Sequence, residues 1–462
     1  MRDSISLGEY LYHALRTRIT SGLLEAGSPF LSIQQLREEY QVGFRTAREV
    51  TQRLQEEGLI AVRPRHTPTI AYSLTGAARQ TALAQAAAQR DALLEVCDTL
   101  TLVLPLFLSG AGGIPPAVPP AQWEEMTRAV GRGLEAGEWR TLVQRFAQAL
   151  RTTGTPLFHS VFIALLSSSR PGLFLGEGRA YTAFSQRIRQ VLTGAMACNL
   201  PQEGQSLRAV LHSYRELVER SLPPQTAPGC TGPLFLWQLP HLPDYRYRRL
   251  VHHLLQDISS GRYPPGSFLP HEGALARSHG LSVSTVRRAM ALLRELGFCR
   301  TLNARGTQVL PRDQAEAIPA LSAPSARQMV YTALQASQLL LLLLESITHL
   351  SLPHVTQTDR DALSHALTQG EQAMPLITQL LLERLPLSPL RHIGTQLFHA
   401  VQWGSYLCLP QATHQAPLHG PALSALFTGD CLCLGQALCA HYHHTAQRIR
   451  QLAAPPLSPG AT

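Results

Sequence analysis

The chain has 462 residues, of which 45% are hydrophobic and 15% are charged, and its formal net charge is +9. This length corresponds to about three domains, and the apolar content is far too high for a disordered chain. All 40 basic residues in that charge count are arginines, because the sequence contains no lysine. We therefore expect a basic protein with several hydrophobic cores.

Apolar runs and cysteines indicate the compartment. The most apolar runs, residues 100–108 and 339–344, are shorter than the roughly 18 residues of a membrane span. The N-terminus carries Asp3 and Glu9 and does not resemble a signal peptide. The eight cysteines are scattered and do not form the framework of a small disulfide-rich domain. These features predict a cytoplasmic protein with reduced thiols and no membrane contact.

A segment near the N-terminus recurs 239 residues later without a gap. Residues 11–58 and 250–297 share fourteen identities in 48 positions, and three glycines of each copy stay in step. A second echo, shifted by 240, pairs residues 154–159 with 394–399, and a weaker one pairs Tyr214 with Tyr442. Repeats of this kind indicate duplicated units, so we expect that a half of about 230 residues occurs twice.

Composition divides each half into a small mixed domain and a helical domain. The first part of each half holds short helical and turn patterns, and the following part is rich in Ala, Leu and Gln at helical spacing. Six prolines between the halves predict a surface linker. The expected boundaries are 1–73 and 74–222 for the first half, 223–243 for the Pro-rich linker, 244–313 and 314–452 for the second half, and 453–462 for a flexible tail.

Each small domain shows three helical patterns followed by two short strand patterns. Ser282 is suited to cap the third helix of the second copy, because a hydroxyl oxygen accepts hydrogen bonds from the free amides of a first turn. Residues 59–72 and 298–310 alternate like two strands around a basic tip. This order predicts a winged helix-turn-helix in each half. The inward face of the third helix is expected to carry Val286, Met290, Leu293 and Leu296.

The outward face of the same helix carries side chains suited to DNA. A helix N-terminus favours phosphate, and arginine forms paired hydrogen bonds with guanine in the major groove. We therefore expect this helix to contact double-stranded DNA. The candidate residues are Arg45, Thr46, Arg48 and Gln52 in the first copy and Ser282, Ser284, Thr285, Arg287 and Arg288 in the second.

These motifs resemble the DNA-binding domain of GntR-type bacterial repressors. In residues 260–270, 281–290 and 305–307, glycine, turn, helix and wing signals follow one another in the family's order. The first copy is similar through Ser21-Gly22 and residues 45–48. The resemblance implies an operator DNA as partner and adds wing contacts at Arg63, Arg65, His66, Arg305 and Gly306.

The chain departs from the family's pattern at two places in each copy. Phe44 and Val283 stand where the family usually shows an arginine just inside the recognition helix. Gln34 and Gly273 stand where an arginine is common in the second helix. We therefore expect a different base preference and a lower affinity than the family pattern implies.

Charge separates the two copies. Residues 1–73 hold nine arginines against eight acids, whereas residues 244–313 hold eleven against five. Because neutralisation of phosphates supplies most of non-specific DNA affinity, the second copy is expected to bind DNA more strongly. A largely structural role for the first copy is the open alternative.

The helical stretches resemble the all-helical sensor domains of the fatty-acid-responsive (FadR/FCD) class of these regulators. The expected fold class is therefore mainly α, with two winged helix-turn-helix domains that are each followed by an all-helical bundle domain. The resemblance also implies a small-molecule effector bound in a helical domain.

Many members of that class hold a metal with an aspartate, a histidine in a Phe-His pair four residues later, and two further histidines. The Phe-His pair occurs twice here, and a threonine stands at the aspartate position in both copies. A zinc site needs about three converging ligands, and the competing interpretation is a set of hydrogen-bonded or solvated histidines. The candidate ligands of a divalent metal are His159, His399, His419 and His441.

We interpret the chain as a DNA-binding transcriptional regulator that responds to a ligand and whose two fused halves act as a pseudo-dimer. Pairing of two such chains is left open. The alternative is a metabolite or metal sensor whose winged helices serve protein–protein contacts. A metal-dependent enzyme built on His399, His419 and His441 is a third interpretation, but the sequence contains no nucleophile elbow, phosphate-binding glycine loop or HExxH motif. We therefore expect no enzymatic activity.

Overall fold

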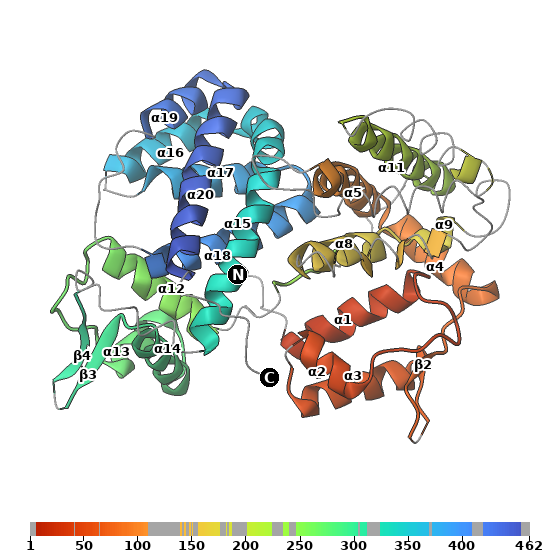
Figure 1. Cartoon of the computed structure of the whole chain (residues 1–462), viewed down its shortest axis with the longest axis horizontal. Helices are drawn as coiled ribbons and strands as arrows, with labels where there is room; N and C mark the ends of the chain where they lie inside the picture. Colours follow the sequence, from red (N-terminus) through yellow and green to blue (C-terminus); the bar gives the residue numbers. More distant parts are fainter. Residues whose placement is uncertain are drawn as a thin grey trace. The chain divides into compact units, whose positions relative to one another are not determined.

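The computed structural model divides the chain into two compact units, Met1–Pro240 with Pro386–Ile393, and His241–Leu385 with Gly394–Thr462. Each unit is described by itself (Figure 1). The structure describes residues 6–40, 42–63, 65–109, 139–140, 143–144, 147–148, 150, 156–175, 182, 184–186, 201–223, 234–239, 246–303, 305–311, 324–368, 372–408 and 419–453. The expected tail lies almost wholly outside these residues.

The first unit begins with a winged helix-turn-helix. Its two strands pair antiparallel, with Ile60 opposite Ile70. The hydrophobic core of this domain is built on the apolar face of the first helix, where Leu11, Leu15 and Ile19 are fully buried. The elements are α1 (Leu7–Thr20), α2 (Ile33–Tyr40), α3 (Phe44–Glu56), β1 (Ile60–Ala61) and β2 (Thr69–Ile70).

The second unit begins with the same framework. Each of its three helices begins and ends 239 residues after its counterpart, and the strand pair of Cys299 with Val309 lies 239 residues after that of Ile60 with Ile70. Three turn glycines with positive φ also recur at this shift, at Gly261, Gly266 and Gly297. The elements are α12 (Arg246–Ser259), α13 (Glu272–His279), α14 (Val283–Glu295), β3 (Cys299–Leu302) and β4 (Gly306–Val309).

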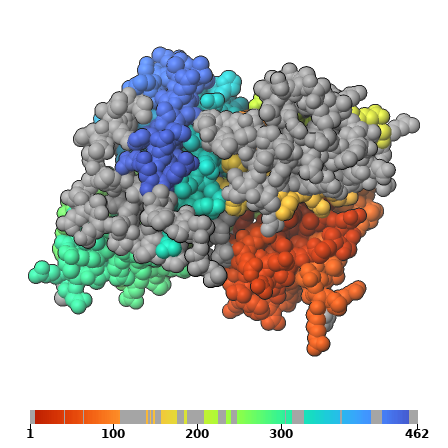
Figure 2. Space-filling view, viewed as in Figure 1, coloured from red at the N-terminus to blue at the C-terminus, as the bar shows by residue number. Residues whose placement is uncertain are grey.

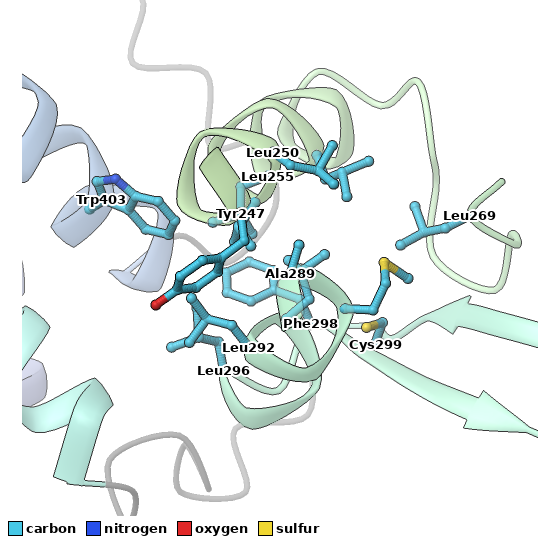
Figure 3. Close-up of a cluster of buried hydrophobic side chains, with 14 of the residues drawn as sticks. Tyr247, Leu250, Leu255, Leu269, Ala289, Leu292, Leu296, Phe298, Cys299 and Trp403 are labelled. Carbon is cyan, nitrogen blue, oxygen red and sulfur yellow. The ribbon is translucent and has the colours of Figure 1, made fainter. Parts of the chain in front are cut away.

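The winged helix of the second unit shares its core with the helical domain that follows it. Trp403 and Ile449 of the helical domain belong to the same buried cluster as Tyr247 and Leu292 of the winged helix. Figure 3 shows the Trp403 ring beside the side chains that α12 and α14 contribute to this cluster. The recognition helix is therefore packed, through one continuous apolar core, onto the helical domain.

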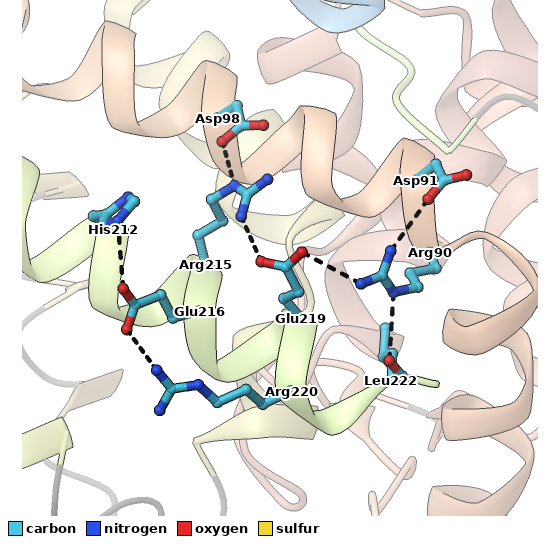
Figure 4. A network of polar contacts seen from close by, with 9 residues as sticks. All are labelled: Arg90, Asp91, Asp98, His212, Arg215, Glu216, Glu219, Arg220 and Leu222. Carbon is cyan, nitrogen blue, oxygen red and sulfur yellow. Dashed lines mark hydrogen bonds and ion pairs between the residues drawn. The ribbon is translucent and has the colours of Figure 1, made fainter. Parts of the chain in front are cut away.

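The helical domain of the first unit is organised around two long helices, α5 and α11, which pack along each other. Arg215 of α11 joins them, because its guanidinium donates to Asp98 of α5 at 2.6 Å and to Glu219 at 2.7 Å. Figure 4 shows how Arg90, the first residue of α5, extends this network through Glu219. The described helices are α4 (Gly76–Ala88), α5 (Arg90–Ser109), α8 (Pro156–Ser168), α9 (Pro171–Phe174) and α11 (Pro201–Ser221).

The helical domain of the second unit has a similar long pair, α15 and α20. The tyrosines of the weak third echo have comparable roles in the two domains. Tyr214 donates to the Ser169 carbonyl at 2.6 Å, and Tyr442 hydrogen-bonds to Thr378 Oγ1 at 2.9 Å. The described elements are α15 (Pro324–Ser351), η2 (Leu352–His354), α16 (Gln357–Thr368), α17 (Ala373–Arg384), α18 (Ser388–Cys408), α19 (His419–Thr428) and α20 (Cys431–Ala453).

One segment, Arg327–His354, is long and apolar enough to cross a membrane by length and composition. This window is longer than the strictly apolar runs considered from the sequence, because it includes polar residues such as Ser337 and Thr348, both of which are buried. However, 67% of the window is buried inside the protein, as in the core helix of a folded domain. A core helix passes the same test, so the segment is weak evidence for membrane contact.

Part of the expected surface linker is buried. Residues 234–239 lie within 223–243, yet Phe235, Trp237 and Leu239 are buried and the Trp237 side chain is only 1% exposed. The indole Nε1 of Trp237 donates to Ser160 Oγ of α8 at 3.2 Å. The proline signal was therefore misleading here, because alternating apolar side chains anchor this stretch in the first unit.

Candidate nucleic-acid interface

The recognition helix of the second winged helix, α14, is fixed from its N-terminus. Ser282 caps it as expected, because its Oγ accepts a hydrogen bond from the Thr285 amide at 3.2 Å. The residues predicted to face inward, Val286, Met290, Leu293 and Leu296, are all buried. This packing leaves the opposite face of α14 at the surface of the winged helix.

The outward face of α14 carries the side chains that the sequence assigned to it. Ser284, Arg287 and Arg288 are exposed, and Thr285 is half-buried. Arg287 Nε donates to Glu272 of α13 at 2.8 Å while 69% of its side chain stays exposed. Arg288 lies over the Tyr247 ring, with its guanidinium carbon 4.4 Å from the ring centroid. Both guanidiniums are therefore held on the protein surface.

The recognition helix of the first winged helix, α3, carries its charges differently. Arg45 is 92% exposed and its Nε donates to Glu49 one turn along at 2.8 Å. Gln52 donates in the same way to Glu56 at 2.9 Å. Arg48 is exposed, and Thr46 is half-buried. The outward face of α3 therefore has carboxylates beside the polar groups that would approach DNA.

Acidic partners also neutralise the end of α3. Arg53 donates to Glu9 of α1 at 2.8 Å, and its guanidinium lies 3.5 Å from the centroid of the Tyr12 ring. The hydrogen bond from Arg53 lowers the pKa of Glu9, which keeps that carboxyl ionised. The Glu57 carboxylate accepts from Tyr12 and Arg16. Glu9 and Glu57 thus compensate the charge of arginines in the same domain, in line with the near-neutral charge of the first winged helix.

The two wings carry exposed arginines at their tips, and the first wing also carries an exposed histidine. Arg63, Arg65 and His66 are exposed in the first wing, and Arg305 is exposed in the second. Arg65 has a φ of 62°, a left-handed backbone conformation that residues other than glycine rarely adopt. Gly306 has a φ of 106° and starts β4 rather than forming the turn itself. The orange hairpin of β1 and β2 projects from the surface in Figure 2.

Sequence reasoning missed two further basic residues, Arg294 near the end of α14 and Arg300 in β3. Arg294 donates to Thr301 of β3 at 2.8 Å, and Arg300 donates to Gln308 across the wing at 3.1 Å. Both arginines are exposed. The signal was present in the sequence, because Arg300 sits at an outward position of the predicted strand and Arg294 follows Arg287 by two helical turns.

The candidate metal ligands lie on helices of different units. His159 is on α8 of the first unit, whereas His399 and His441 are on α18 and α20 of the second. The side chain of His419 is outside the described part of the chain. Within the described residues, no three His, Cys, Asp or Glu side chains are grouped as metal ligands would be. The metal site stays a prediction.

A different histidine contact joins α12 to α18 within the second unit. The ring of His252 lies 6.2 Å from that of His399 and 5.9 Å from that of Trp403, measured between centroids. Burial, together with the neighbouring His399 and His253, lowers the pKa of His252 to about 4. His252 is therefore neutral near pH 7 and belongs to the packing between the winged helix and its helical domain.

A family model supplies the assignment of these domains. The model for bacterial regulatory proteins of the gntR family matches residues 7–68 and 246–309, and these ranges cover the two winged helices described above. Both winged helices are of the GntR type. The helical domains lie outside the matched residues, so their FadR/FCD class stays a prediction.

One curated relative is similar to part of the chain. An uncharacterized HTH-type transcriptional regulator of Rhizobium meliloti (strain 1021) is 35% identical over 68 residues, which is 15% of this chain and 28% of that relative. The chain thus spans little more than a quarter of the curated relative it matches.

Three solved structures are also similar to part of the chain. Streptococcus agalactiae GntR is 18% identical, with 44% of this chain and 99% of that chain covered and a TM-score of 0.20. A putative transcriptional regulator GntR from Rhodococcus sp. RHA1 is 14% identical, with 45% and 98% covered and a TM-score of 0.24. E. coli McbR/YncC is 16% identical, with 47% and 98% covered and a TM-score of 0.22.

Proposed function

We propose that the protein is a transcriptional regulator that binds double-stranded operator DNA through its GntR-type winged helices. The observation that carries this proposal is the outward face of α14, where Ser284, Arg287 and Arg288 are exposed opposite a fully buried apolar face. Hydroxyl and guanidinium groups at the start of a recognition helix suit phosphates and guanine edges. Arg305 at the wing tip adds a second point of contact.

The two winged helices are proposed to act as a pseudo-dimer within one chain. Their three helices begin and end at equivalent positions of the repeat. Two equivalent domains of this kind are suited to bind the two half-sites of one operator. Their surfaces differ, because Arg45 and Gln52 of α3 are hydrogen-bonded to carboxylates of the same helix, whereas α14 carries no acid on its outward face before Glu295. The operator is therefore imperfect and asymmetric, and the second winged helix supplies most of the affinity.

A small molecule bound in a helical domain is proposed to modulate DNA binding. The support is the shared core of the second unit, in which Trp403 and Ile449 pack with residues of α12 and α14. An effector that shifts α18 or α20 therefore moves groups in contact with the recognition helix. Such coupling needs a ligand with different affinities for the two arrangements.

Salt-dependent DNA binding tests the proposal. The full chain is first used to select bound sequences from random duplex DNA, and affinity for the selected site is then measured across salt concentrations. Arg287→Ala is expected to weaken binding at least about tenfold and to flatten the salt slope. The matched control is Arg450→Ala on α20, which removes an exposed arginine of the helical domain.

The outcomes separate the proposal from its rival. A steep slope that is flattened by Arg287→Ala and not by Arg450→Ala supports DNA binding through α14. Weak binding without salt dependence contradicts it. That result favours a metabolite or metal sensor whose winged helices contact proteins, an alternative supported by the carboxylates on the first winged helix.

A further inference from the structure

The first residue of each recognition helix is an exposed large apolar side chain. Phe44 begins α3 and is 55% exposed, and Val283 begins α14 and is 41% exposed. They occupy the same place in the repeat, because 239 residues separate them. Only seven large hydrophobic residues are exposed in the part of the chain that the structure describes, and two of them share this position.

Neither side chain belongs to the core of its domain. The buried face of α14 is made by Val286 and Met290, and the residues beside Val283 are the capping Ser282 and the exposed Ser284. Phe44 stands between Gly43 and the exposed Arg45. Each is thus an exposed apolar side chain whose neighbours in the sequence are exposed polar residues or glycine, at the end of the helix that would approach base edges.

We propose that Phe44 and Val283 select thymine by covering its C5-methyl group in the major groove. This inference rests on the proposed DNA binding. The thymine methyl is an apolar group on the base edges of that groove, and apolar side chains are its usual partners. The N-terminal residues of a recognition helix are those that reach base edges in helix-turn-helix complexes.

The surroundings favour DNA over a protein partner. A docking surface for another protein needs a contiguous apolar patch of several hundred Å², whereas Val283 is flanked by Ser282 and Ser284 on the same turn. The cap hydroxyl, Arg287 and Arg288 then hold the backbone and neighbouring bases while Val283 contacts one methyl. Phe44, flanked by Arg45, has the corresponding position in the first winged helix.

Replacement of thymine by uracil tests the inference, since the two bases differ in the major groove only by this methyl. The full chain is bound to its selected duplex, and each thymine is replaced singly by deoxyuridine. At the contacted position we expect binding to weaken about three- to fivefold, as the loss of one buried methyl group predicts. In Val283→Ala the thymine and uracil duplexes of one half-site are expected to bind equally, and in Phe44→Ala those of the other.

A matched control keeps the test specific. Leu432 is 69% exposed on α20, so Leu432→Ala removes an exposed apolar side chain that is distant in sequence from both recognition helices. This variant is expected to keep the full difference between thymine and uracil. All three side chains are exposed, so the substitutions leave the cores intact.

Failure of the inference and failure of the proposed function give different results. Salt-dependent binding with no effect of uracil at any position overturns the inference and leaves the proposed function standing. If uracil weakens binding at one half-site only, and only one of the two variants removes this effect, the inference holds for the helix of that variant and is overturned for the other helix. Absence of salt-dependent DNA binding overturns the proposed function and the inference together.

Discussion

At the residue scale, Arg287 takes part in an ion pair of the fold and is also a proposed DNA contact. Its Nε donates to Glu272 of α13, and 69% of the side chain is exposed. An ion pair this exposed stabilises a fold by about 1 kcal/mol at most. A phosphate or a guanine edge would compete with Glu272 for the same guanidinium. The carboxylate therefore opposes DNA binding while contributing little to stability.

Glu272→Gln is accordingly expected to raise affinity for the selected duplex several-fold at low salt, because it removes a negative charge beside the proposed phosphate contacts. The melting temperature is expected to change little. Salt-titrated binding and thermal unfolding measure the two effects, with Glu383→Gln on α17 as a control for the loss of an exposed carboxylate. Unchanged or weaker binding by Glu272→Gln would contradict the competition.

At the element scale, the start of α16 shows how one carboxylate holds two helices. Thr356 precedes the helix, and its amide donates to Asp359 Oδ2 at 2.9 Å. Arg384 at the end of α17 also donates to this oxygen, at 2.8 Å. Asp359 thus caps α16 and ties it to α17. Asp359→Ala is expected to lower the free energy of unfolding by about 1–2 kcal/mol.

The same carboxylate predicts a pH dependence. The hydrogen bond from Arg384, with those from Thr356 and the positive charge of Arg384, lowers the pKa of Asp359 to about 2. A group with a lowered pKa stabilises the folded state above its unfolded pKa, and this contribution is lost as the pH falls from about 4 toward about 2. Urea unfolding of Asp359→Ala should therefore depend less on pH in this range than that of the natural chain. An equal dependence in both proteins would contradict the assignment.

At the scale of the whole molecule, the two winged helices share a framework and differ in how they join their helical domains. In the first unit, Gly172 of α9 packs against the turn after α1, and its amide donates to the Ser21 carbonyl at 2.9 Å. A Cβ on Gly172 would lie 2.6 Å from the Gly22 Cα. Gly261, which corresponds to Gly22 in the second unit, has no atom of the described residues within 4 Å of the Cβ that a substitution would add.

Gly172→Ala is therefore expected to destabilise the first unit by about 1–3 kcal/mol, because backbone atoms have to move to admit the methyl group. Gly420→Ala on α19 is the control, since a Cβ there would meet no atom of the described residues within 4 Å. Thermal unfolding followed by circular dichroism compares the two variants. Equal melting temperatures would show that the close approach of the two backbones is not required.

Local signals predicted most of the winged helices. The cap at Ser282, the turn glycines and the inward face of α14 follow from hydroxyl, φ and periodicity rules that act over a few residues. Contacts distant in sequence were not predictable in this way. The pairing of Arg287 with Glu272 and the burial of Trp237 depend on side chains brought together only by folding. No local rule fixed the class of the helical domains.

The same backbone framework recurs 239 residues along the chain. The residues that support each recognition helix are therefore distinct from the residues that it exposes. In each copy the interior positions hold the helix, so its solvent-facing positions are free to diverge without loss of folding. The two sets of exposed side chains can therefore differ, as they do between α3 and α14. Under the proposed pseudo-dimer, substitutions in one recognition helix would change the preference for one half-site alone, whereas in a symmetric dimer of identical subunits every substitution affects both half-sites.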